Sequence, residues 1–266
     1  MEHLRGVRDR VLDDAGLVAG ETLLDVGCGD GLIAFGALER GAGMVIFSDI
    51  SQHLLDESAR LADELGASGR CLFVRAPADD LAAIGDASVD AVTTRSVLIY
   101  VARKREAFGE FHRVLRPAGR LSVFEPINRL NRFLRAYDAR DVQDLDDRVK
   151  GVFEAMQPRQ SDPMVDFDDR DLVELAEQAG FGRVQLTLEV TSEPPEPVPW
   201  DTFLDTAWNP NIPTMREVME QQLTAGERGR YERVIRPLVE QGRGRRRMAV
   251  AYLRAVKLAE GGQVSG

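Results

Sequence analysis

The chain has 266 residues, 44% of them hydrophobic, which is enough for one substantial core or for one core with insertions. Its formal net charge is −10, and because an acidic chain repels nucleic-acid phosphates and anionic membranes, we expect neither of them as a partner. A charged N-terminal stretch, the lack of a membrane-spanning apolar run and only two cysteines predict a cytoplasmic protein without a signal peptide, a disulfide framework or a cysteine-rich metal site.

The first half of the chain alternates between segments of helical period and short apolar runs. The expected helices are residues 5–16, 31–41, 51–66 and 104–119, the last of them ended by Pro117 and Gly119. The expected strands are residues 22–27, 44–50, 71–76, 89–97 and 120–126. This repeated alternation predicts an α/β fold with a doubly wound, mostly parallel sheet and helices on both faces.

The regular alternation ends after Pro126. Residues 127–167 are polar, carry acidic clusters and show no strand pattern, so helices and loops are expected there. A helix is then expected at 168–182 and a strand at 183–192. A proline-rich connection, a largely helical stretch at 200–242 and a last strand at 247–258 complete the chain.

The stretch "TLLDVGCGDG" places Gly27, Gly29 and Gly31 directly after the first strand. Glycine lets the backbone approach a ligand closely, and the helix that follows points its free N–H groups at the same place. A dinucleotide fingerprint would require a glycine at position 32, where the chain has Leu32, which argues against a nicotinamide cofactor. A strand-to-helix turn that binds nothing is the alternative for such a motif alone.

Asp25, two residues before the first glycine, completes "DVGCGDG", which resembles the first motif of the class I S-adenosylmethionine-dependent methyltransferases. The resemblance implies a Rossmann-like sheet of seven strands, in which the last strand runs antiparallel between the fifth and sixth. It also implies that the glycine loop, Cys28 included, wraps the methionine part of the cofactor and that the acidic residue helps to orient its amino group.

Two further stretches extend the resemblance across residues 20–126, and more loosely across 168–193 and 246–257. "VIFSDI" ends a strand in Asp49, whose carboxylate is expected to bind the ribose hydroxyls, with Ile50 packing on the adenine. The alternative for Asp49 is an N-cap of the helix expected at 51. "RSVLIYV…FHRVLRPAGRLSVFEP" is similar to the later motifs of the family, and Arg95 in it is expected to contact the cofactor.

The segment "FVRAPADDL" departs from the family pattern. Relatives often have an aspartate that meets the adenine amino group, where this chain has Pro77. The contact with adenine is therefore expected from the backbone N–H of Ala78 and from Asp79 or Asp80.

The two irregular stretches predict the domain organisation. Residues 1–126, 168–193 and 246–260 are expected to form the cofactor-binding core, and residues 127–167 and 194–245 an inserted helical cap over the active site. Tyr137, Trp200 and Trp208 are expected to line an aromatic substrate pocket in this cap. The alternative is that the two tryptophans form the hydrophobic core of the cap.

Polar residues after the fourth and fifth strands are the candidates for catalysis. Tyr100 and Glu125 are placed there, whereas none of the three histidines has a position that predicts a base. The alternatives are that Glu125 caps a helix or holds an arginine, and that catalysis needs positioning alone. We expect a methyltransferase, monomeric or dimeric, that uses S-adenosylmethionine and no metal to methylate a small molecule on oxygen, nitrogen or carbon. Two alternatives remain: a related protein that binds the cofactor in a regulatory role, and a nicotinamide-dependent oxidoreductase.

Overall fold

A computed structural model describes residues 2–131, 135–207 and 212–259 of the chain. The chain divides into two compact units. The first contains residues 1–127, 167–188 and 250–266, and the second contains residues 128–166 and 189–249.

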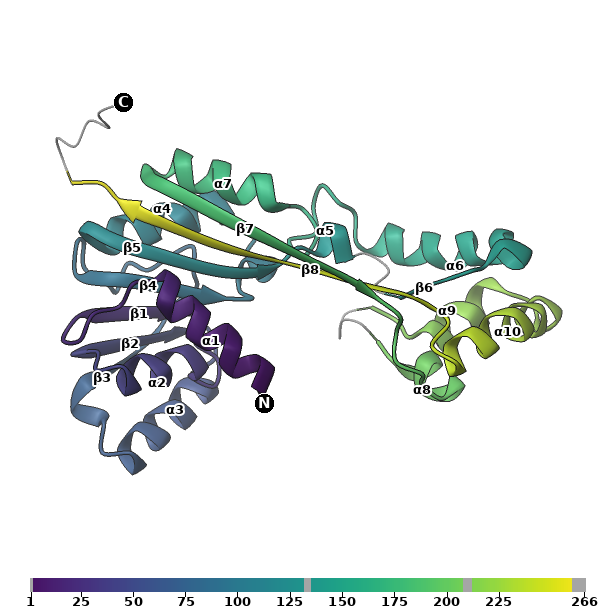
Figure 1. The fold of residues 1–266 in the computed structure, drawn as a ribbon, viewed down its shortest axis with the longest axis horizontal. Coiled ribbons are helices and arrows are strands. Elements are labelled where there is room, and N and C mark those ends of the chain that lie inside the picture. Colours follow the sequence, from purple (N-terminus) through teal and green to yellow (C-terminus); the bar gives the residue numbers. More distant parts are fainter. Residues whose placement is uncertain (1, 132–134, 208–211, 260–266) are drawn as a thin grey trace. The chain divides into compact units, whose positions relative to one another are not determined.

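The first unit is built on a mostly parallel sheet (Figure 1). Strand β1 pairs in parallel with β2 and β4, β2 with β3, and β4 with β5, whereas β8 pairs antiparallel with β5 and also pairs with β7. The strands are β1 (Thr22–Val26), β2 (Met44–Asp49), β3 (Cys71–Arg75), β4 (Val89–Arg95), β5 (Leu115–Pro126), β7 (Phe181–Glu193) and β8 (Gly244–Lys257). The predicted fold class, including the antiparallel last strand beside the fifth, is confirmed.

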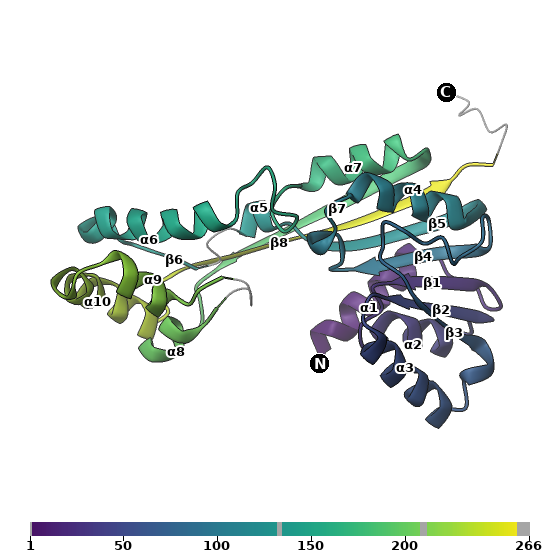
Figure 2. The same ribbon diagram turned by 180° about the vertical axis from the view of Figure 1, so that it is seen from behind.

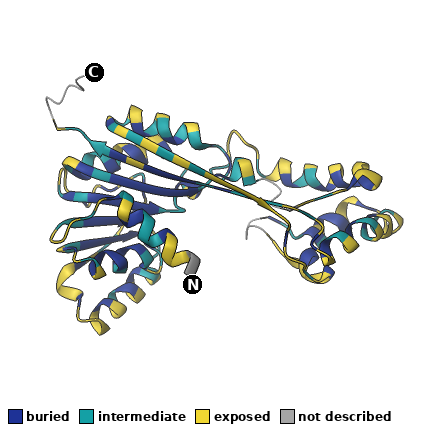
Figure 3. Cartoon of the chain, viewed as in Figure 1, coloured by how far each residue is buried: buried dark blue, intermediate teal, exposed yellow. Residues whose placement is uncertain are grey.

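Helices cover both faces of this sheet (Figures 1 and 2). One face carries α1 (Glu2–Asp14), α2 (Leu32–Glu39) and α3 (Gln52–Glu64), and the other carries α4 (Lys104–Val114) and α7 (Asp169–Gln178). Leu23, Val45 and Phe47 point from the strands into the core beneath α1–α3. Figure 3 shows how strongly the buried residues concentrate on these strands. Two short 3₁₀ turns, η1 (Ser68–Arg70) and η2 (Leu98–Tyr100), complete the unit.

The boundary between α4 and β5 differs from the prediction. The expected helix ran to Pro117 and Gly119, but α4 ends at Val114 and β5 begins at Leu115. Leu115 pairs with Val89 at the start of β4, and the register then shifts before the regular ladder begins at Ala91. Pairing with β4 therefore outweighs the helical pattern of the last residues.

The second unit is mainly helical, as predicted, but it also contains a short strand that the sequence pattern did not reveal. Strand β6 (Arg135–Tyr137) pairs antiparallel with residues Gly244–Arg246 of β8, so the sheet has eight strands rather than seven. The helices are α5 (Asn128–Asn131), α6 (Gln143–Met156), α8 (Trp200–Asp205), α9 (Met215–Gln222) and α10 (Ala225–Glu240), with a 3₁₀ turn η3 (Arg140–Val142). The apolar faces of α6, α8, α9 and α10 share one core that includes Val149, Val218 and Ile235.

Candidate functional site

A cavity of about 430 Å³ lies in the first unit, where the parallel strands β1, β2, β3 and β4 end. Ligands of open α/β sheets bind at this edge because the strand-to-helix loops converge there. The lining residues are Gly27, Asp49, Ile50, Ala76, Pro77, Ala78, Asp79, Arg95, Ser96, Val97, Tyr100, Val101 and Ala102. Seven of them are residues for which the sequence predicted a role in the site.

The glycine loop bends tightly at one side of the cavity. Gly27, Gly29 and Gly31 all have positive φ angles, of 66°, 54° and 78°. A Cβ on Gly27 would lie 2.2 Å from Cγ2 of Val97, whereas a Cβ on Gly29 would meet nothing within 4 Å. The loop is thus packed closely against Val97 at Gly27, whereas its backbone at Gly29 is open. A ligand can bind against such an open stretch of glycine backbone.

Asp49, at the end of β2, holds this loop in place. Its Oδ2 accepts the N–H of Gly29 at 2.9 Å and its Oδ1 accepts the N–H of Ser51 at 2.9 Å. The side chain also lines the cavity. Each carboxylate oxygen can accept more than one hydrogen bond, so Asp49 retains acceptor capacity for a ligand with two neighbouring hydroxyl groups.

Asp25, in β1, and Cys28, within the glycine loop, do not line the cavity. One oxygen of Asp25 accepts the hydroxyl of Thr93 at 2.8 Å, and burial raises the pKa of this carboxyl to about 7. The N–H of Cys28 donates to the carbonyl of Ser48 at 2.9 Å. Burial also raises the pKa of the Cys28 thiol, which makes it a poor nucleophile. Contacts of these two residues with a cofactor stay predictions.

The segment from Ala76 to Asp79 forms a second part of the cavity wall. Ala78 lines the cavity, and Asp79 does so while its carboxylate is paired with Arg103 at 2.9 Å. Because part of the acceptor capacity of Asp79 is used in this ion pair, the N–H of Ala78 is the better candidate for a polar contact with a bound base.

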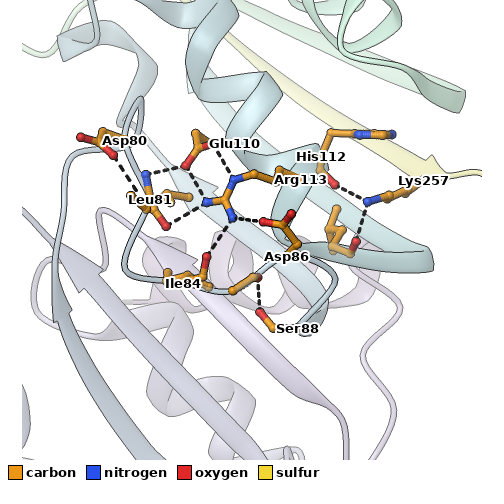
Figure 4. Close-up of polar contacts among 12 residues, drawn as sticks. Asp80, Leu81, Ile84, Asp86, Ser88, Glu110, His112, Arg113 and Lys257 are labelled. Carbon is orange, nitrogen blue, oxygen red and sulfur yellow. Dashed lines mark hydrogen bonds and ion pairs between the residues drawn. The ribbon is translucent and has the colours of Figure 1, made fainter.

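Arg113 on α4 anchors the loop that continues from this wall (Figure 4). Its guanidinium binds Glu110 at 2.7 Å, Asp86 at 2.6 Å and the carbonyl oxygens of Ile84 and Leu81, each at 2.9 Å. A planar guanidinium with five donors is suited to bridging several acceptors in this way. The loop 80–88 is thereby fixed to a helix of the core.

Arg95, Ser96 and Tyr100 form the third side of the cavity. Arg95 ends β4, and its guanidinium makes no hydrogen bond or ion pair with another described residue, which leaves this group available to an anionic ligand. Tyr100 is 69% exposed although it lines the cavity. Ser96 has a φ of 57°, a left-handed conformation that is uncommon for a residue with a side chain.

Glu125, near the end of β5, does not line the cavity. Its side chain is fully buried, and its Oε1 accepts the N–H groups of Val97 at 2.8 Å and Leu98 at 2.9 Å. The predicted role of Glu125 as a base has no support from this placement and stays a prediction. Sequence reasoning missed the role of Val97, because no local pattern marks a valine that packs against a glycine 70 residues earlier.

The predicted substrate residues belong to the second unit. Trp200 is 5% exposed and stacks on Phe203 with ring centroids 5.3 Å apart, inside the helical core. Tyr137 packs edge-on against Phe203 at 5.8 Å. Trp208 lies outside the described residues. Packing in the helical core explains the burial of Trp200. Contacts of Tyr137, Trp200 and Trp208 with a substrate remain predictions.

Comparison with known proteins agrees with the geometry of this cavity. Residues 24–123 match the family described as "Methyltransferase domain". The ubiquinone/menaquinone biosynthesis C-methyltransferase UbiE of Pseudomonas putida is 36% identical over 130 residues, which are 47% of this chain and 50% of that protein. The corresponding protein of Pseudomonas syringae pv. tomato is 38% identical over 141 residues. The chain spans about half the length of the curated relatives that it matches.

The chain therefore resembles the class I S-adenosylmethionine-dependent methyltransferases over residues 24–123. Solved structures of this methyltransferase fold align with nearly all of it. A putative methyltransferase from Bacillus halodurans has a TM-score of 0.57 at 16% identity and covers 95% of this chain and 99% of its own. A geranyl diphosphate methyltransferase in complex with SAM has a TM-score of 0.55 at 20% identity, covering 96% of this chain and 85% of its own.

Among the described residues, no helix is both long and apolar enough to cross a membrane. The same part of the chain contains no group of three or more histidine, cysteine, aspartate or glutamate side chains arranged to hold a metal ion.

Proposed function

We propose that this protein transfers a methyl group from S-adenosylmethionine to a small organic molecule. The observation that carries the proposal is the cavity at the ends of β1–β4, where Gly27, Asp49, Ile50, Ala78 and Arg95 converge. These residues come from the carboxyl ends of four strands or from the loops that follow them, and together they offer an open glycine backbone, a carboxylate, an apolar side chain, a free N–H and a cation.

The residues of the cavity fit the parts of this cofactor. The carboxylate of Asp49 would accept hydrogen bonds from the ribose hydroxyls, and Ile50, which is 67% exposed, would cover the adenine. The N–H of Ala78 would donate to the adenine, and the guanidinium of Arg95 would bind the carboxylate of the methionine part. Gly29 leaves its side of the loop open for the chain of the cofactor.

S-adenosylmethionine supplies an electrophilic methyl group on a positively charged sulfur. The protein therefore has to align the accepting atom and exclude water, and it needs a base only where that atom is a weak nucleophile. We assign the contact with the accepting molecule to Tyr100, since its side chain lines the cavity and its surface remains accessible. The contribution of residues of the second unit to substrate recognition remains a prediction.

The cofactor assignment is tested by calorimetric titration with S-adenosylhomocysteine and, separately, with NADH. We expect the wild type to bind S-adenosylhomocysteine and not NADH. Asp49→Ala should weaken binding by about tenfold or more, because a hydrogen bond to a charged group is removed and the loop loses its anchor at Gly29. Asp30→Ala is the matched control, because Asp30 is an exposed acidic residue of the same loop that does not line the cavity.

Methyl transfer is then tested with isotope-labelled S-adenosylmethionine over a panel of phenols, amines and activated carbon acids. Incorporation that depends on Tyr100 supports the proposed reaction. Binding of S-adenosylhomocysteine without transfer to any acceptor would favour a cofactor-binding protein with another role. The fold permits that outcome, because one structure with a TM-score of 0.56 is described as a [4+2]-cyclase. Binding of NADH in place of S-adenosylhomocysteine would refute the assignment.

A further inference from the structure

A buried carboxyl group lies directly behind the wall of the cavity. Glu125 is the second-last residue of β5, and its Oε1 accepts the backbone N–H groups of Val97 and Leu98 at 2.8 and 2.9 Å. These two N–H groups begin the η2 turn, which follows β4. A carboxylate that accepts the first free N–H groups of a turn stabilises it in the same way as a helix cap.

The turn held by Glu125 shapes the cavity. Ser96, Val97, Tyr100 and Val101 all line it. Ser96 adopts its left-handed conformation while its N–H donates to the carbonyl of Phe124 at 2.8 Å, so the end of β5 holds the strained residue as well. Such a conformation persists only where the surroundings impose it.

Val97 connects the turn with the glycine loop. Its Cγ2 occupies the space that a Cβ on Gly27 would need, since the two positions would be only 2.2 Å apart. The side chain of Val97 therefore rests on the backbone of Gly27. A displacement of the turn would remove this support from one side of the loop that we assign to the cofactor.

A buried cation secures the other end of the turn. Lys104 is 6% exposed, and its ammonium donates to the carbonyl of Val101 at 2.9 Å. It also lies 4.9 Å from the centre of the ring of Phe167. The carboxyl group at the N–H end and the ammonium group at the carbonyl end match the dipole of the turn.

We propose that Glu125 is a positioning residue of the cofactor site, which holds the turn 96–101 against Gly27 and orients Tyr100 toward the cavity. The proposal rests on the proposed function, in that this cavity binds S-adenosylmethionine. It assigns to Glu125 a role other than that of a base, because the group is buried behind the wall and its contacts are to the backbone. Burial raises the pKa of Glu125 to about 7, and a neutral carboxyl still offers a carbonyl oxygen to the two N–H groups.

The test compares three variants by thermal unfolding and by titration with S-adenosylhomocysteine. Glu125→Ala should weaken binding about tenfold, because two buried N–H groups lose their acceptor and the turn can shift. Glu125→Gln keeps an oxygen in the place of Oε1 and should bind within about threefold of the wild type. Asp90→Ala is the matched control, because Asp90 likewise accepts a backbone N–H, that of Thr22 at 2.8 Å, but at the opposite end of β1 and β4. It should lower the melting temperature and leave the affinity unchanged.

The outcomes separate the possible explanations. Wild-type affinity in Glu125→Ala would overturn the inference, and so would an equal loss in Glu125→Ala and Asp90→Ala, since that would be a general effect of destabilisation. A Glu125→Gln variant as weak as Glu125→Ala would overturn the role of backbone hydrogen bonding. Failure of the wild type itself to bind S-adenosylhomocysteine would instead refute the proposed function.

A second variant keeps the inference testable if Glu125→Ala does not fold. Val97→Ala leaves the carboxyl group and its bonds in place and removes only the two methyl groups that rest on Gly27. We expect it to fold and to weaken binding of S-adenosylhomocysteine severalfold. Wild-type affinity in Val97→Ala would show that support of the glycine loop by the turn does not matter for binding.

Discussion

The contact between Gly27 and Val97 leads to a quantitative prediction for Gly27→Ala. Gly27 has a φ of 66°, and an alanine held in this left-handed region costs about 1 kcal/mol. The new Cβ would lie 2.2 Å from Cγ2 of Val97 and 3.3 Å from its Cβ and Cγ1. Relief requires movement of a turn that Glu125 holds, so overpacking should add about 1–3 kcal/mol. We expect the free energy of unfolding to fall by about 2–4 kcal/mol.

Urea unfolding followed by circular dichroism measures this loss. Gly29→Ala is the control, because Gly29 also has a positive φ, of 54°, but a Cβ there meets nothing within 4 Å. It should cost only the backbone strain of about 1 kcal/mol. Combining Gly27→Ala with Val97→Ala should recover about 1–2 kcal/mol, since the clashing methyl groups are gone. This prediction would be refuted if Gly27→Ala and Gly29→Ala lowered the free energy of unfolding equally. It would also be refuted if the effects of Gly27→Ala and Val97→Ala on this free energy were simply additive.

Two further predictions concern the wall of the cavity and the buried carboxyl group. Arg113→Ala should lower the free energy of unfolding by about 2 kcal/mol and speed hydrogen exchange of the loop 80–88, because the carbonyl oxygens and carboxylates around the guanidinium lose their donor. Arg113→Lys should not restore protection of this loop from hydrogen exchange, because one ammonium group cannot span the same acceptors. Wild-type protection of the loop in Arg113→Lys would contradict this account. Since burial raises the pKa of Glu125 from 4.5 to about 7, its folded form binds more protons than its unfolded form between these values. The stability of the wild type relative to Glu125→Gln should therefore be greatest below pH 4.5 and fall as the pH rises toward 7, by at most about 1.4 kcal/mol per pH unit; a flat difference across this range in urea unfolding would rule it out.

The features that the sequence predicted well are local in the chain. The strands β1 and β2 are short buried runs followed at once by a glycine loop or an acidic residue, and Gly27 and Asp49 therefore had to come to the carboxyl edge of a parallel sheet. Hydrophobic period and turn residues are properties of neighbouring positions, so they can be read without any knowledge of the tertiary structure.

The features that the sequence did not reveal depend on partners far along the chain. Leu115 starts a strand rather than ending a helix because it pairs with Val89, and β6 exists because it pairs with the beginning of β8. Strand pairing is non-local, and a three-residue segment such as Arg135–Tyr137 has too few positions to show an alternating pattern.

Glu125 shows the same division within the site. From the sequence it is an acidic residue at the carboxyl end of a strand, which makes it a reasonable candidate for a base. In the folded chain its oxygen accepts N–H groups of residues 97 and 98, and its side chain is fully buried. The sequence by itself determined the class of fold, because this follows from local pattern, and its resemblance to a family predicted the cofactor and the loops expected to bind it. Only the tertiary structure decided which polar groups face the cavity and which support it from behind, because burial and hydrogen bonding depend on residues that folding brings together.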